Sequence, residues 1–168
     1  MTKQETYDLL TARGIRYEVT EHAAVYDMEE LSHVPLPYPD RMGKNLFVRD
    51  GKRSAWCLIT VMGDKRVDLN AFRRAHGLRR LSFASADELR EILRLSPGAV
   101  TPLGLLNDDE KRVTLYLDSA FMGGLIGVHP CDNTATVWLR AEDLAALLRD
   151  RGSAVEVTDL GGSDKERP

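Results

Sequence analysis

Hydrophobic and polar residues follow two different periods along the chain, and short stretches rich in glycine, proline or aspartate separate the segments. Apolar residues spaced three or four apart predict helices, whereas alternating or short continuous apolar runs predict strands. The helical period is found between Thr2 and Gly14, over 27–33, from Asp68 to Gly77, from Ser85 to Pro97 and over 142–149. Strand patterns recur in short segments, among them 15–20, 45–48, 54–62, 112–117 and 134–139. The chain is therefore expected to form about five helices and about seven strands.

Short motifs mark where several of these elements begin or turn. Residues 2–5 and 85–88 both fit the capping box, in which Thr or Ser at the helix start pairs with Glu three residues later. Asp50 and Gly51 lie between two apolar runs and favour a hairpin. Residues 34–42 hold three prolines in five positions, which excludes regular structure and predicts a stiff loop that could form a pocket wall.

The order of the elements has no regular strand–helix–strand rhythm, so the sequence predicts an α+β fold with a mixed, largely antiparallel sheet. A chain of 168 residues, 43% hydrophobic and 29% charged, is long enough for one domain with a core. We expect that domain to span 1–160 and 161–168 to form a disordered tail. No apolar run approaches the roughly 20 residues of a membrane span, and the N-terminus lacks a signal-peptide pattern. A cytoplasmic protein without a membrane partner is expected.

Positive charge is concentrated in one part of an acidic chain. The net charge is -3, but residues 41–80 hold eleven Lys and Arg against three Asp and Glu, and the rest of the chain holds twelve against twenty-three. A basic region in an acidic protein favours a surface that meets phosphates, and an ordinary solvated surface is the alternative. DNA is disfavoured as a partner, because no helix-turn-helix is evident and the basic residues are spread over strands as well as helices.

The segment 127–138, GVHPCDNTATVW, joins a polar loop to an apolar strand. His129 could bind a ligand or act as an acid or base, or it could be a structural histidine; the proline after it holds its backbone extended. Cys131 could be a nucleophile paired with His129. Two residues apart in a loop is a poor geometry for such a pair, so we interpret Cys131 as a residue without a chemical role.

Two other segments carry unusual residues. Lys44 opens a strand directly after a glycine, and it could present a cation at the mouth of a pocket or lie in solvent. Asn45 should point to the opposite face of a regular strand, so both residues could line one site only if the backbone is irregular or main-chain groups take part. The uncharged segment 98–102, GAVTP, follows a helix, and its glycine allows the backbone to approach a ligand. A buried connector would have the same sequence pattern.

Motifs for metals and nucleotide cofactors are missing from the sequence. It contains no CxxC or HExxH for zinc and no GxGxxG or GxxxxGK[ST] loop for phosphates. A Ser–His–Asp set and a carboxylate pair are not evident either. We therefore expect no metal and no cofactor. If the protein is an enzyme, its substrate or an ordered water must share the work, which requires a substrate with an activated bond.

Taken in order, four segments resemble a known family: KNLFVRD (44–50), ITVMGDKRVDL (59–69), LRRLSFASADELREILRLSPGAVTPLGLLND (78–108) and IGVHPCDNTATVWL (126–139). They are similar to the YbaK/prolyl-tRNA editing domain family and, within it, to the free-standing bacterial ProX-type proteins that deacylate alanyl-tRNA(Pro). The resemblance implies a single α+β domain with a partly barrel-like sheet. It also implies hydrolysis, without metal, of the ester between a wrong amino acid and the 3′-terminal adenosine of tRNA.

The resemblance implies roles for individual residues as well. Lys44 would contact the terminal nucleotide and the aminoacyl group, and the backbone of 98–102 would frame the aminoacyl group and the attacking water. His129 would lie near the terminal ribose, with Asn133 and Thr134 supporting its loop. We therefore expect a catalytic set of Lys44, Gly98 and His129, and a substrate-binding set of Asn45, Ala99, Val100, Thr101, Pro102, Asn133 and Thr134.

These expectations combine into one function. An aminoacyl ester is activated, so the protein need only position it, stabilise the developing oxyanion and exclude bulk water, which accounts for the missing triad. The expected substrate is mischarged Ala-tRNA(Pro), selected by the size of the amino acid. The expected partners are the acceptor end of tRNA(Pro) and prolyl-tRNA synthetase. The alternatives are deacylation of Cys-tRNA(Pro) or another small aminoacyl-tRNA, and a non-catalytic module that binds tRNA or the synthetase.

Overall fold

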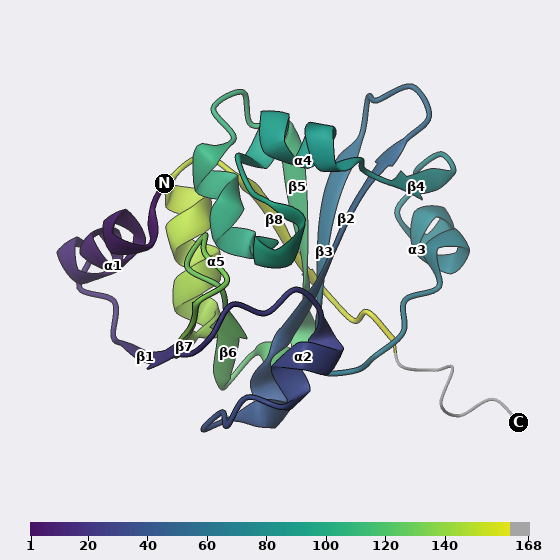
Figure 1. Ribbon diagram of the computed structural model, residues 1–168. Helices are drawn as coiled ribbons and strands as arrows, with labels where there is room; N and C mark the ends of the chain where they lie inside the picture. Colours follow the sequence, from purple (N-terminus) through teal and green to yellow (C-terminus); the bar gives the residue numbers. More distant parts are fainter. Residues whose placement is uncertain (162–168) are drawn as a thin grey trace, which may run out of the picture.

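The computed structural model describes residues 1–161, in which eight strands and five α-helices form two sheets with helices packed around them (Figure 1). The strands are β1 (Tyr17–Glu21), β2 (Gly43–Asp50), β3 (Trp56–Met62), β4 (Leu81–Phe83), β5 (Val113–Asp118), β6 (Leu125–Val128), β7 (Ala135–Arg140) and β8 (Ala154–Thr158). The α-helices are α1 (Lys3–Ala12), α2 (Met28–Ser32), α3 (Leu69–Ala75), α4 (Ala86–Leu93) and α5 (Ala141–Asp150). The predicted α+β class is confirmed. The expected tail lies outside the described residues except for Gly161.

The strands divide into two sheets rather than one. Five strands form a sheet in the order β4-β2-β3-β5-β8, in which β2 pairs antiparallel with β3 and β4, and β5 pairs parallel with β3 and β8. The other sheet has the order β1-β7-β6 and is antiparallel. The mixed, largely antiparallel pairing is as expected. The sheets do not close into a barrel, so the partly barrel-like sheet that the resemblance implied is not found.

The helix starts follow the sequence motifs closely. Thr2 and Ser85 each form a complete capping box, with Glu5 and Glu88 as the respective partners. In both boxes the hydroxyl accepts from the backbone of the Glu, and the Glu carboxylate accepts from the backbone of the cap. Asp68 caps α3 through its carboxylate. These local hydrogen bonds explain why the sequence predicts these helix starts well.

The hairpin between β2 and β3 is closed by a side chain. The Asp50 carboxylate accepts from the backbone N–H groups of Ser54 and Ala55 and from the Ser54 hydroxyl. The bond from the Ser54 hydroxyl is the main reason that the pKa of Asp50 lies below its usual range. The expected hairpin at Asp50 and Gly51 is confirmed, with a longer loop than a two-residue turn.

Hydrophobic packing covers both faces of the five-stranded sheet. On one face, Leu58 and Leu115 join a large core that also takes residues of α4, α5 and the second sheet. On the other face, Ile59 and Tyr116 pack against Phe72 of α3, which lies on the far side of β2 and β3 from α5 (Figure 1). Burying each of these large side chains contributes about 2 kcal/mol, so the sheet is held from both sides.

The proline-rich segment is more ordered than expected. Pro39–Arg41 forms a short 3-10 helix, although the three prolines had indicated a loop without regular structure. The Arg41 guanidinium donates to the carbonyls of Leu125 (2.7 Å) and Phe121 (2.8 Å). Met42 then forms an isolated parallel bridge with Gly127. The segment thereby fixes the start of β2 against the second sheet.

None of the helices between residues 1 and 161 has the length and hydrophobicity that a membrane span requires.

Candidate functional site

A cavity of about 260 Å³ opens at the start of β2, where three separate parts of the chain meet. The first is the segment around α2, the second is the beginning of β2, and the third is the turn after α4, with one histidine added from the end of β6. The cavity is lined by Val25, Tyr26, Asp27, Met28, Leu31, Met42, Gly43, Lys44, Asn45, Pro97, Gly98, Val100 and His129.

Five of the ten residues predicted for the site line this cavity: Lys44, Asn45, Gly98, Val100 and His129. The other five do not. Ala99, Thr101 and Pro102 are buried, and Asn133 and Thr134 lie behind the wall. The structure thus brings together all three residues predicted as catalytic. The five predicted residues that do not line the cavity lie in the segments 99–102 and 133–134, next to residues that do.

Lys44 and Asn45 have opposite directions on a regular strand, as expected. Lys44 pairs with Val61 and Asn45 with Thr60 in the β2–β3 ladder. Both nevertheless line the cavity. Its lining runs over four consecutive residues, 42–45, and includes Gly43, so main-chain groups take part, which is the second of the two expected conditions.

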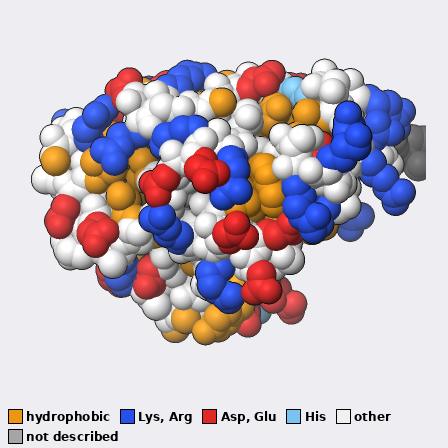
Figure 2. All heavy atoms as spheres, turned by 90° about the horizontal axis from the view of Figure 1, so that it is seen from above, with side chains coloured by type: hydrophobic (Ala, Val, Ile, Leu, Met, Phe, Trp, Pro, Cys, Tyr) orange, Lys and Arg blue, Asp and Glu red, His pale blue; other side chains and the backbone are white. Residues whose placement is uncertain are grey.

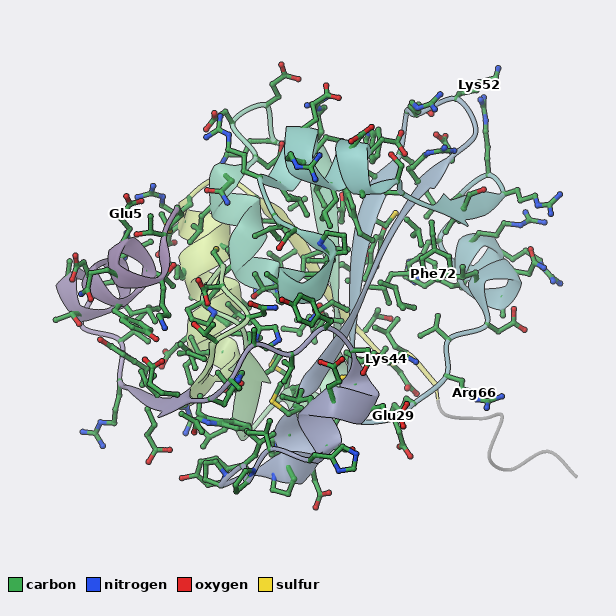
Figure 3. The ribbon with its side chains drawn as sticks, viewed as in Figure 1. Glu5, Glu29, Lys44, Lys52, Arg66 and Phe72 are labelled. Atoms are coloured by element: carbon green, nitrogen blue, oxygen red, sulfur yellow. The ribbon has the colours of Figure 1, made fainter. Side chains whose placement is uncertain are left out.

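The Lys44 ammonium group is weakly held at the rim of the cavity. Its Nζ lies 3.5 Å from the carbonyl oxygen of Lys65, which is the outer limit of a hydrogen bond. Figure 3 shows the Lys44 side chain beside α2, whose residues Met28 and Leu31 line the same cavity. A cation on a flexible stem at this position can reach an anionic or carbonyl group of a bound ligand.

The Asn45 side chain ties β2 to the loop after α4. Its Oδ1 accepts from the buried Thr60 hydroxyl (2.7 Å), which orients the amide so that Nδ2 donates to the Val100 carbonyl (3.2 Å). Because both ends of the amide have partners, Asn45 fixes the distance between the strand and the loop. This is a structural contribution that the sequence pattern did not indicate.

The loop 97–102 presents its backbone to the cavity. Its short 3-10 turn, Pro97–Ala99, is closed by a bond from the Ala99 N–H to Ser96, and the Thr101 hydroxyl caps the next 3-10 helix. A Cβ at Gly98 would lie 2.9 Å from Cδ1 of Tyr26 and 3.2 Å from the Val25 carbonyl oxygen. The protein itself would crowd a Cβ at this position, so glycine is favoured there for steric reasons.

His129 is held in one tautomer by its own loop. Its Nδ1 lies 2.8 Å from the Ala135 carbonyl oxygen, which can only accept, so Nδ1 carries the proton and Nε2 is an acceptor when the ring is neutral. Burial lowers the pKa of His129 below its usual range, and the nearby His22 adds to the effect. A neutral imidazole beside the cavity suits hydrogen bonding to a hydroxyl group better than ion pairing.

The polar residues after His129 hold the walls of the cavity. Asn133 donates from Nδ2 to the Val25 carbonyl (2.8 Å), and its own carbonyl accepts from the Val25 N–H (3.3 Å). Asp132 accepts from the N–H and hydroxyl of Thr134, and the hydroxyl bond is the main reason for its lowered pKa. Lys3 of α1 donates to the Thr134 hydroxyl (2.8 Å). Asn133 and Thr134 therefore connect the loop of His129 to the segment at Val25 and to α1.

Several lining residues were not identified from the sequence. Val25, Tyr26, Met28 and Leu31 come from the segment before the prolines, where the only signal was a short predicted helix. The proline segment itself lines mainly a second, larger cavity of about 560 Å³ on the other side of α2. Within residues 1–161, no group of three His, Cys, Asp or Glu side chains is placed to hold a metal ion.

The fold and the matched sequence define the class of this protein. The model of the aminoacyl-tRNA editing domain family matches residues 22–147, and the chain belongs to that family. The chain is 36% identical over 159 residues to the "Prolyl-tRNA editing protein ProX" of Acetoanaerobium sticklandii, covering 94% of this chain and 97% of that one. It is 35% identical over 148 residues to the "Prolyl-tRNA synthetase associated domain-containing protein 1" of Bos taurus, covering 85% and 86%.

A solved structure gives the same fold. The crystal structure of a candidate trans-editing enzyme for prolyl-tRNA synthetase superposes with a TM-score of 0.69, at 22% identity, over 94% of this chain and 95% of that one. The likeness extends over nearly the whole of both chains, so the fold is shared.

Proposed function

We propose that this chain is a trans-editing deacylase that hydrolyses mischarged Ala-tRNA(Pro). The observation that carries the proposal is the convergence of Lys44, Gly98 and His129 on one small cavity, from parts of the chain more than 30 residues apart. Membership of the editing-domain family and the similarity to a prolyl-tRNA editing protein support the substrate class.

The chemistry needs little from the protein because the aminoacyl ester is activated. Water attacks the ester carbonyl carbon, the bond from that carbon to the ribose oxygen breaks, and the ribose oxygen takes a proton. Alanine and uncharged tRNA leave. The ammonium group of Lys44 stabilises the charge that develops on the carbonyl oxygen, and the loop at Gly98 brings main-chain groups close to it. The Nε2 atom of His129 accepts a hydrogen bond from a ribose hydroxyl and positions the tRNA end.

Selection by size follows from the apolar wall. Val25, Met28 and Leu31 border the space beside Gly98, where the amino-acid side chain enters. A wall of this kind admits alanine and excludes the bulkier proline ring. A synthetase site built for proline discriminates poorly against a smaller side chain, because each missing methylene is worth only about 1–3 kcal/mol. A separate protein that removes the smaller amino acid solves that problem.

The test is deacylation of Ala-tRNA(Pro), Cys-tRNA(Pro) and Pro-tRNA(Pro) by the pure protein. We expect rapid loss of alanine and no loss of proline, and Lys44→Ala should slow the reaction by about 100-fold, the usual cost of removing one group that stabilises the oxyanion. Lys52→Ala is the matched control, because Lys52 is exposed at the hairpin tip, far from the cavity (Figure 3).

The same assay separates the alternatives. Preferential hydrolysis of Cys-tRNA(Pro) would change the amino acid but leave the enzyme class intact. A salt-sensitive complex with tRNA without faster ester loss would indicate a binding module instead, since phosphate contacts weaken as salt rises. Absence of hydrolysis with all three substrates would overturn the proposal.

A further inference from the structure

Phe83 differs from every other phenylalanine in the chain. Phe47, Phe72 and Phe121 are at most 6% exposed, whereas Phe83 is 61% exposed. It ends β4, the edge strand of the five-stranded sheet. The core therefore does not account for an aromatic ring at this position.

The ring borders a hollow that continues from the candidate site. This hollow, of about 210 Å³, is distinct from the two cavities described above. It is lined by Phe83 and Leu89 and also by Asn45, Pro97 and Val100. The last three residues line the cavity of the candidate site as well. The hydrogen bond from the Asn45 amide to the Val100 carbonyl thus joins two residues of the shared wall. A ligand that leaves the first cavity over this wall meets Phe83 next.

The edge of β2 is open along this hollow. β4 pairs with β2 only over 48–50, and the N–H of Ala84 adds one more bond, to the Phe47 carbonyl. Residues 43–46 therefore have no strand partner on that edge among the described residues. The short β4 leaves room for a flat group between Phe83 and the loop after α4.

Positive charge lies at the start of β4, the strand whose last residue borders the hollow. Arg79 and Arg80, both exposed, directly precede β4. Figure 2 shows Lys and Arg side chains gathered on the side of the molecule that carries α3, β4 and the β2–β3 hairpin. An exposed aromatic ring combined with nearby cations is the arrangement by which proteins hold single-stranded nucleic acid, with bases stacked on the ring and phosphates near the cations.

We propose that the hollow beside Phe83 binds a nucleobase of the substrate's single-stranded 3′ end, stacked on the Phe83 ring, while the ester occupies the neighbouring cavity. This assignment rests on the proposed function, and it adds a second point of attachment for the tRNA. The base is the terminal adenine or the base before it. Stacking tolerates any base, so the hollow holds the end of the substrate without reading its sequence.

The test compares KM and kcat of Phe83→Ala with those of the native protein. The substrates are alanyl-tRNA(Pro) and 3′-O-alanyl-adenosine. For the tRNA we expect KM to rise about tenfold with little change in kcat, because stacking binds the substrate without touching the ester. Phe83→Trp should restore or lower KM. Val19→Ala is the matched control, because Val19 is also an exposed apolar residue but lies on β1 in the other sheet.

The two substrates identify the base. A raised KM for alanyl-adenosine places the terminal adenine on Phe83, and a normal one places the preceding base there. An unchanged KM for both substrates overturns the inference.

A binding experiment keeps the inference separate from the proposed function. The trinucleotide CCA should quench the tryptophan fluorescence of Phe83→Trp even if no ester is hydrolysed. The signal of the native protein, measured under the same conditions, is subtracted to remove the contribution of Trp56 and Trp138. Lack of quenching at millimolar CCA would reject the hollow as a nucleobase site, whereas quenching without hydrolysis would reject only the deacylase.

Discussion

The two loops that border the cavity are built from opposite kinds of residue. The loop 97–102 is apolar and uncharged, and the side chains of Ala99, Thr101 and Pro102 are buried in the body of the protein. The loop 129–134 is polar, and the side chains of His129 and Asn133 are bonded to the backbone of neighbouring segments. One loop is held in place by its own burial, while the other holds its neighbours in place by hydrogen bonds.

This difference predicts which kind of substitution disturbs each loop most. A loop that presents its backbone at close range is damaged by added atoms, because there is no space for them. A loop that positions other segments through side chains is damaged by removed atoms, because the partner groups lose their hydrogen bonds. The loop 97–102 should therefore be most sensitive to enlargement, and the loop 129–134 to truncation.

The largest effect is expected for Gly98→Ala. The added methyl group would lie 2.9 Å from Tyr26, 3.1 Å from Asn133 Nδ2 and 3.2 Å from the Val25 carbonyl oxygen. The last of these is backbone and cannot rotate away, so the cavity must change shape. We expect kcat/KM for Ala-tRNA(Pro) to fall by about 10- to 100-fold, because these neighbours must shift by a few tenths of an ångström and a displacement near 1 Å at a reacting group costs about 100-fold.

Gly51→Ala is the control for this substitution, because a Cβ at Gly51 in the hairpin loop has no neighbour within 4 Å. Thermal melting should show that both variants remain folded. Native activity in Gly98→Ala would mean that the close approach at this loop has no part in catalysis.

A smaller effect is expected for Asn133→Ala in the opposite loop. The substitution removes the bond from Nδ2 to the Val25 carbonyl and loosens the wall that we propose excludes bulky amino acids. A bond of this kind is worth about 1 kcal/mol, so kcat/KM for Ala-tRNA(Pro) should fall by about tenfold or less. Hydrolysis of Pro-tRNA(Pro) should rise at the same time, which a loss of stability alone would not cause.

Asn70→Ala, on the exposed face of α3, is the control for Asn133→Ala. The double variant Gly98→Ala/Asn133→Ala sharpens the comparison between the loops. The Cβ added at Gly98 would lie 3.1 Å from Asn133 Nδ2, and this crowding is absent when residue 133 is alanine, so the separate losses should not add. Strict additivity would show that the loops act independently.

The sequence predicted the elements of the fold well because their signals are local. The capping boxes at Thr2 and Ser85 and the caps at Asp27 and Asp68 are formed within four residues, and each was found where the pattern placed it. The division into two sheets could not be predicted in this way. It depends on long-range contacts such as the Arg41 guanidinium on the carbonyls of Leu125 and Phe121, which leave no periodic signal.

Only part of the candidate site could be predicted, because only some of its residues have a local signal in the sequence. Gly98 and His129 stand out in the sequence because of unusual neighbours, and both line the cavity. Tyr26 and Leu31 also line it but look like ordinary residues of a loop and a short amphipathic helix. Their place is decided by the hydrogen bonds between Val25 and Asn133, which are 108 residues apart in the chain.

The protonation of His129 gives a prediction on stability. Burial lowers its pKa in the folded state, so the unfolded chain binds a proton first as the pH falls below the ordinary value near 6.5. The contribution of His129 to stability is therefore complete above that pH and is lost as the pH falls towards the lowered pKa. For one proton the slope is at most about 1.4 kcal/mol per pH unit.

Urea unfolding of the native protein and His129→Asn between pH 7.5 and 5 measures this contribution. The pH dependence of the variant should be smaller than that of the native protein. His33→Asn, which removes an exposed histidine, is the matched control for the loss of an imidazole. Equal pH dependence in His129→Asn and the native protein would contradict a buried neutral imidazole.

The smallest effect is expected at Cys131, a residue of the polar loop that does not line the cavity. Its thiol is largely buried, and burial raises the thiol pKa, so at neutral pH it is protonated and a poor nucleophile. Its backbone has φ of 61°, a conformation that favours glycine. Cys131→Ala should therefore keep activity on Ala-tRNA(Pro) within about twofold, and Cys131→Gly should raise the free energy of unfolding by up to about 1 kcal/mol. A loss of activity in Cys131→Ala as large as that in Gly98→Ala would restore the thiol as a reacting group and remove the distinction between the two loops.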